Sequence, residues 1–168
     1  MTLDSVAILK AAAIGVGGTA ALDLWATFLK LVTGAPATDW AKVGRWLGHL
    51  RAGRFVHASI VETVPVRHEL LLGWIFHYGI GATYGLLLVW IQGPAWLSKP
   101  SVLAPVALSL ALLVAPYFVM MPGLGLGVAG SRTPRPNITR LKSALAHTAF
   151  GLGMFGTAFV LNRLFGDI

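Results

Sequence analysis

The stretch that decides the fold is LLLGWIFHYGIGATYGLLLVWI, residues 70–91, which contains no Asp, Glu, Lys or Arg. A helix that crosses the hydrocarbon core of a bilayer needs about 20 mostly apolar residues. Apolar intervals of similar length lie at residues 11–31, 101–122 and 143–162, and the first of them contains Asp23 and Lys30. The interval 101–122 carries Pro105 and Pro116, which kink a helix but are tolerated inside a bundle. The sequence therefore predicts an all-α, polytopic membrane protein with four transmembrane helices in one domain, residues 1–168.

The composition of the whole chain supports a membrane protein. Of its residues, 56% are hydrophobic and 11% are charged, and the formal net charge is +7. Soluble domains have about 25% charged residues. The charges form a few blocks between apolar stretches, as in membrane proteins, so we expect no nucleic-acid partner. The absence of cysteine excludes disulfides, Cys-based metal sites and a thiol nucleophile.

The orientation of the helices follows from the Lys and Arg residues between them, because cytoplasmic loops carry the excess. Residues 34–69 and 123–142 contain nine Lys and Arg, and Lys30 lies on the same side, whereas the other side has only Lys10, Lys99 and Arg163. Both termini are therefore predicted to be non-cytoplasmic, and the two long loops cytoplasmic.

The first long loop contains an amphipathic pattern, TDWAKVGRWLGHL, residues 38–50. It predicts a short interfacial helix with Thr38 as N-cap and with Trp40 and Trp46 at the acyl boundary. Its basic side, with Lys42, Arg45 and His49, is expected to face anionic head groups. In the rest of this loop His57 and His68 are expected to be solvated.

Three of the predicted spans carry an ionisable residue at a similar depth. Asp23, His77 and His147 lie about 9–12 Å inside the cytoplasmic helix ends at 1.5 Å per residue. Each lies on a stripe of small residues spaced by four, which is typical of helix faces that contact other helices. The stripes are Gly15, Thr19 and Asp23; Gly73, His77, Gly81 and Gly85; and His147 and Gly151.

Several roles for this polar layer remain open. It could fix the bundle through an Asp–His hydrogen bond, or carry a proton or cation, as Asp and His do in pumps and transporters. With Met120 and Met121 at a similar level, it could bind a transition metal. His77 and His147 could ligate haem. An enzyme acting on a lipid or quinone is less favoured, because the sequence has no recognisable nucleophile with its base.

The glycine-rich segment PGLGLGVAGSRTPRP, residues 122–136, formally matches a dinucleotide fingerprint, but it lacks the strand–helix context that gives the motif its meaning. Two interpretations are open: a flexible turn at the membrane surface, or a nest for a lipid phosphate or another anion. The residues of this candidate nest are Gly125, Gly127, Ser131, Arg132 and Arg135.

Four stretches together resemble a known family. These are VGRWLGHLRAGRF (residues 43–55), HYGIG (77–81), MMPGLGLGVAGSRTPRP (120–136) and AHTAFGLGMFG (146–156). They resemble a bacterial family of small four-helix inner-membrane proteins classified only as a domain of unknown function. The resemblance implies a bacterial inner (plasma) membrane location and supplies no activity, cofactor or site residue.

The functional prediction is therefore a small membrane protein that transports or binds a proton, metal ion or small solute through Asp23, His77 and His147. The alternative is a non-enzymatic accessory or structural subunit of a larger membrane complex. Membrane lipids with anionic head groups are expected partners, and a homo-oligomer is expected because four helices enclose little volume. The accessory subunit could bind haem through His77 and His147, and the cofactor stays unknown.

Overall fold

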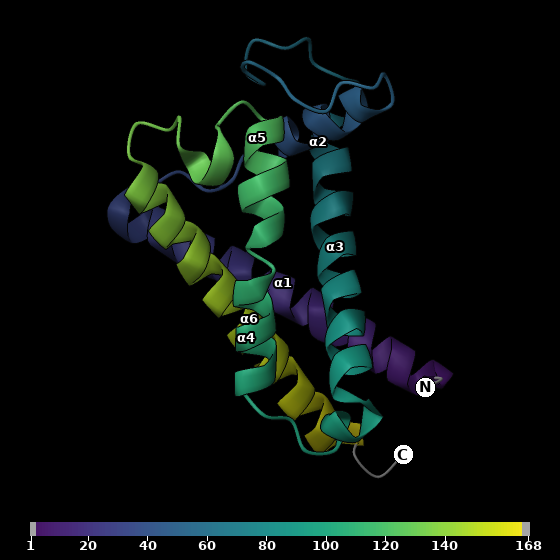
Figure 1. Cartoon of the computed structure of the whole chain (residues 1–168). Helices are drawn as coiled ribbons and strands as arrows, with labels where there is room; N and C mark the ends of the chain where they lie inside the picture. The colour runs from purple at the N-terminus through teal and green to yellow at the C-terminus, as the bar shows by residue number, and fades with distance from the viewer. Residues whose placement is uncertain (1–2, 166–168) are drawn as a thin grey trace. The chain divides into compact units, whose positions relative to one another are not determined.

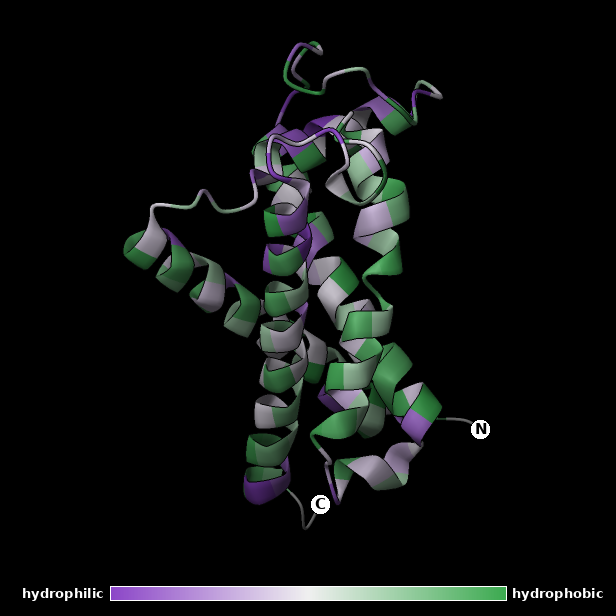
Figure 2. Ribbon diagram, turned by 60° about the vertical axis from the view of Figure 1, so that its left-hand side comes forward, coloured by the Kyte–Doolittle hydropathy of each residue, from purple (hydrophilic) through white to green (hydrophobic). Residues whose placement is uncertain are grey.

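The computed structural model describes residues 3–165, in which every regular element is helical. The chain divides into two compact units. Unit 1 contains the N-terminal segment through Ala35, Tyr78–Ala111 and the chain from Ala146 onward, and unit 2 contains Pro36–His77 and Leu112–Leu145. Figure 2 shows that the long helices carry mainly hydrophobic residues. Four helical stretches are long and apolar enough to cross a membrane.

The four predicted spans are confirmed as helices of membrane-spanning length. They are α1 (Ser5–Thr33), α3 (Glu69–Gln92), Leu103–Gly123 and α6 (Pro136–Phe165). Helices α1 and α6 begin earlier than predicted. A charged side chain near the end of a helix can lie on the helix surface, and it does not interrupt the backbone hydrogen bonds. Helix α1 begins where Asp4 Oδ1 accepts from the Ala7 amide at 2.7 Å, and α6 begins with proline, which suits a first helical position.

The third span is interrupted, as its prolines predict. It consists of α4 (Leu103–Ala111), a π-helical segment η2 (Pro116–Met120) and the short α5 (Met121–Gly123). Pro116 has no backbone N–H to donate to the preceding turn. The Tyr117 amide donates to the Leu113 carbonyl at 3.0 Å, and this bond resumes the helix beyond the break.

Glycines allow the close helix contacts in unit 1. A Cβ on Gly15 of α1 would overlap the Gly81 carbonyl of α3, and one on Gly85 would overlap the Ala11 carbonyl of α1. Gly18 of α1 similarly leaves room for Met154 of α6. The core of unit 1 forms around these contacts: Ala11, Ile14, Leu88, Val89, Trp96, Phe150, Met154 and Ala158. Trp96 comes from the short helix η1 (Pro94–Leu97).

In unit 2, α2 (Trp40–Leu50) lies across the N-terminal end of α3 (Figure 1). A Cβ on Gly44 would overlap the Glu69 carbonyl, and one on Gly73 would overlap the Trp40 carbonyl, so the two backbones touch. The predicted amphipathic helix is confirmed, although its N-cap is Asp39 rather than Thr38.

The apolar face of α2 packs against protein. Val43 is fully buried and Trp46 is 6% exposed, in a cluster with Ile60 and Leu124. The expectation that the Trp46 side chain lies against lipid at the acyl boundary is therefore wrong. Its indole N–H donates to the Phe55 carbonyl at 2.9 Å, a partner that a hydrocarbon environment does not offer. A position of α2 at the membrane interface stays a prediction.

Candidate functional site

Asp23 lies on the face of α1 that packs against α3. It follows Thr19 and Gly15 at intervals of four residues, and both of these contact Gly81 of α3. Tyr78, three residues before Gly81, donates its hydroxyl hydrogen to Asp23 Oδ2 at 3.0 Å. A carboxylate within an apolar helix needs such a donor, because an isolated charge there is strongly unfavourable. The small-residue stripe thus brings a tyrosine to the carboxylate.

Sequence reasoning missed Tyr78, because it considered only histidines as partners. The available signal was the spacing, since Tyr78 and Gly81 lie one turn apart and so share a helix face. A tyrosine hydroxyl is an effective hydrogen-bond donor to a carboxylate. The prediction that His77 or His147 also lies within reach of Asp23 stays a prediction.

His77 is a buried residue of α3, 6% exposed, that belongs to unit 2. Its ring stacks on the indole of Trp40 with centroids 3.8 Å apart, and Trp74 lies at 5.7 Å. The stripe on α3 therefore contacts two different helices. Its first part, with Gly73, contacts α2, and its second part, with Gly81, contacts α1.

The other residues of the predicted metal site lie on three further elements. His147 is a half-buried residue of α6, one turn before Gly151. Met120 ends η2 and Met121 begins α5, where it is 6% exposed. Asp23 and His147 belong to unit 1, and His77 and both methionines belong to unit 2. Within residues 3–165 no three His, Asp or Glu side chains form a group that could hold a metal ion, and the mixed site with methionine stays a prediction.

The glycine-rich segment forms an ordered loop around η3 (Val128–Gly130). Gly125, Gly127 and Gly130 have φ values of 85°, 74° and 69°, which favour glycine. The amides of residues 130–133 donate to carbonyls within the loop. These four amides already donate hydrogen bonds, so an anion at this loop would have to bind to side chains.

Three of the five predicted nest residues line one shallow pocket of about 300 Å³: Gly127, Ser131 and Arg132. Gly125 has a packing role, since a Cβ there would overlap the Ala58 carbonyl. Arg135 is exposed on the same loop and is not among the residues that line the pocket.

Arg45 has a role that the sequence did not indicate. It was expected on the basic face of α2 toward head groups, but its Nε and Nη2 donate to both carboxylate oxygens of Glu69 at 2.9 and 2.8 Å. Its Nη1 also donates to the carbonyls of Ile60 and Thr63 at 3.2 and 3.0 Å. The hydrogen bond to Glu69, aided by its charge, raises the pKa of Arg45. Arg45 therefore joins α2, α3 and the loop between them.

His57, expected to be solvated, is 8% exposed. Its Nδ1 lies 3.0 Å from the Gly123 carbonyl oxygen, and its backbone amide donates to the same oxygen at 3.1 Å. The expectation for His57 is wrong, because two segments distant in sequence enclose it. His68 is exposed, as expected.

Comparison with known proteins gives one finding. A family model described as a protein of unknown function, DUF2938, matches residues 12–161. No curated protein and no solved structure matches the chain. The match covers all four candidate spans in large part, together with the glycine-rich loop. This membrane protein therefore belongs to the DUF2938 family.

Proposed function

We propose that this protein binds a proton within the membrane and passes it across, using the carboxyl group of Asp23 and the hydroxyl of Tyr78. The hydrogen bond of 3.0 Å between these groups is the observation that carries the proposal. Both groups hold an exchangeable proton, which favours a proton over other solutes. An ionisable residue inside a transmembrane helix that faces another helix is a functional candidate by default.

The depth of Asp23 suits an intermediate proton site. Asp23 precedes the end of α1 at Thr33 by ten residues, about 15 Å at the rise of an α-helix. At that depth the ionised carboxylate depends on Tyr78 and other polar neighbours, whereas the protonated form is less costly to bury. A carboxyl group that is stable in both its ionised and its protonated form can bind a proton and then release it.

The same proposal includes an orientation in a bacterial plasma membrane. The charge distribution favours both termini on the non-cytoplasmic side and the loops around α2 and η3 in the cytoplasm. With this orientation Asp23 is nearer to the cytoplasmic than to the external end of α1.

Proton flux into liposomes that contain a pH-sensitive dye tests the proposal, with an imposed pH gradient and a potassium ionophore to remove the membrane potential. Asp23→Asn should abolish the flux of the reconstituted protein, because the amide keeps the shape and cannot exchange the proton. Tyr78→Phe should reduce the flux about tenfold, since a hydrogen bond to a charged group contributes roughly 1.5–3 kcal/mol.

Tyr84→Phe is the matched control. It removes the same hydroxyl from α3, six residues further along, where the ring of Tyr84 packs edge-on against Phe150. This variant should conduct like the wild type. Wild-type flux in Asp23→Asn, or flux in the wild type no higher than in empty liposomes, would exclude the proposed pathway.

A further inference from the structure

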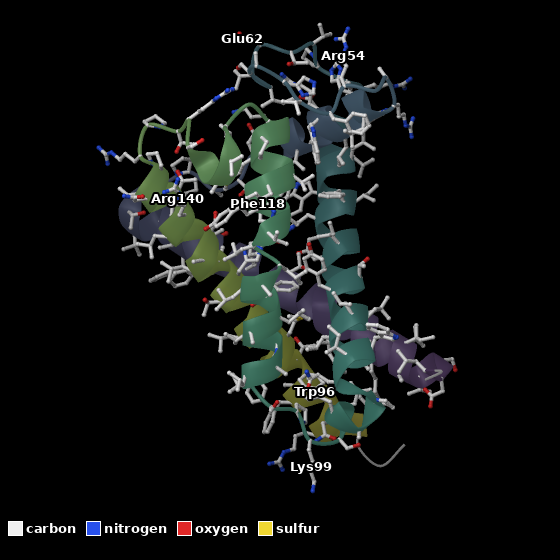
Figure 3. The ribbon with its side chains drawn as sticks, viewed as in Figure 1. Arg54, Glu62, Trp96, Lys99, Phe118 and Arg140 are labelled. Atoms are coloured by element: carbon white, nitrogen blue, oxygen red, sulfur yellow. The ribbon has the colours of Figure 1, made fainter. Side chains whose placement is uncertain are left out.

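A pocket in unit 2 combines a polar end with an apolar wall. The pocket is lined by Val56, Pro122, Gly127, Val128, Ser131 and Arg132. Its backbone is held in place by Arg140 of α6, labelled in Figure 3, whose Nε donates to the Ala129 carbonyl at 3.1 Å. Gly127 has a φ of 74°, a conformation that favours glycine.

The polar end consists of Ser131 and Arg132, which are both exposed. Within residues 3–165 the Arg132 guanidinium forms no ion pair or hydrogen bond, and the Ser131 hydroxyl has no hydrogen-bond partner. A guanidinium and a hydroxyl that line the same pocket are well suited to a phosphate group, which accepts several hydrogen bonds.

Two valines of the apolar wall are exposed. Val56 is 70% exposed and Val128 is 50% exposed. These two valines and Pro122 line the same pocket as Arg132. A ligand that suits both parts has a phosphate joined to apolar carbon.

The position of the pocket in the chain places it at a membrane surface. The loop of residues 124–135 joins the end of one candidate span at Gly123 to the beginning of the next at Pro136. Unit 2 also carries nine Lys and Arg residues against three Asp and Glu. Such an excess attracts anionic lipids and repels the ammonium group of a zwitterionic lipid.

We infer that this pocket binds the phosphate group of an anionic phospholipid, with Arg132 and Ser131 on the phosphate oxygens and Val56 and Val128 against the glycerol and first acyl carbons. The inference is independent of proton transfer at Asp23, which involves other residues. It assigns the glycine-rich loop a binding role.

Native mass spectrometry of the delipidated protein in detergent tests the inference, by titration with phosphatidylglycerol or phosphatidylcholine. Phosphatidylglycerol should bind more tightly, and Arg132→Gln should raise its Kd about tenfold, the usual effect of losing one charge-assisted hydrogen bond. Ser131→Ala should raise it by a smaller factor. Arg135→Gln removes the same charge from the same loop outside the pocket, and it should change the Kd less than twofold.

Two outcomes would overturn the inference. Equal losses for Arg132→Gln and Arg135→Gln would show general attraction by charge without a site. Competition by inorganic phosphate or glycerol 3-phosphate, with no preference between the two lipids, would show a site for soluble phosphate. Thermal unfolding of the lipid-free Arg132→Gln variant should match the wild type, because the Arg132 side chain forms no ion pair or hydrogen bond within residues 3–165.

Discussion

Replacement of Arg45 should be the most damaging single change to a charged side chain of unit 2. Arg45 donates two hydrogen bonds to Glu69 and two to carbonyls of the loop between α2 and α3. The side chains of Arg45 and Glu69 are 13% and 19% exposed. Loss of one partner from a buried pair costs about 3–5 kcal/mol, and partial exposure reduces this, so we expect Arg45→Met to lower the free energy of unfolding by about 2–3 kcal/mol.

Lys42→Met on the same helix provides the control. Lys42 forms an ion pair with Asp39 at 3.2 Å, but both side chains are well exposed, at 39% and 49%. Surface pairs of this kind contribute about 0–1 kcal/mol. We therefore expect the Lys42 variant to unfold close to the wild type in the same detergent.

Chemical unfolding in mixed detergent micelles, followed by circular dichroism, measures both variants. A double-mutant cycle with Glu69→Gln should give a coupling energy of about 1–2 kcal/mol, because the two side chains share two hydrogen bonds. Equal stabilities for the Arg45 and Lys42 variants would refute the reasoning. A coupling energy of zero would also refute it, because Arg45 and Glu69 would then contribute no more to stability than two independent surface charges.

Three further predictions follow from burial and topology. Because the chain has no cysteine, Ser59→Cys and Ser98→Cys can be labelled singly in cells, and only the Ser98 variant should react with an impermeant reagent. Gly15→Ala should destabilise the protein by about 1–3 kcal/mol, because its Cβ would overlap the α3 backbone, whereas Gly79→Ala, which has open space, should be neutral or slightly stabilising in thermal unfolding. In a variant with Trp46 as the only tryptophan, emission should be blue-shifted and resist both iodide and brominated lipids, and strong quenching by either would contradict its burial.

The sequence alone was sufficient to predict the membrane-spanning helices, because the bilayer sets their length and apolar character. The prediction of residues 70–91 differs from α3 (Glu69–Gln92) by one residue at each end. The break near Pro116 was also predictable, since it follows from the missing N–H of proline. The intervals 11–31 and 143–162 are shorter than the first and fourth helices, because they begin after Lys10 and Lys142. Both lysines lie within helices whose ends depend on capping.

Partners distant in sequence required the tertiary structure. Asp23 and Tyr78 are 55 residues apart, and the contact between α1 and α3 at their glycines brings the two side chains together. The burial of Trp46 and His57 likewise depends on the segment around Gly123, which no local pattern connects to α2. Hydropathy along a chain shows which faces avoid water, and it does not distinguish a face that meets lipid from one that meets protein. Only the packing of the helices decides between those two.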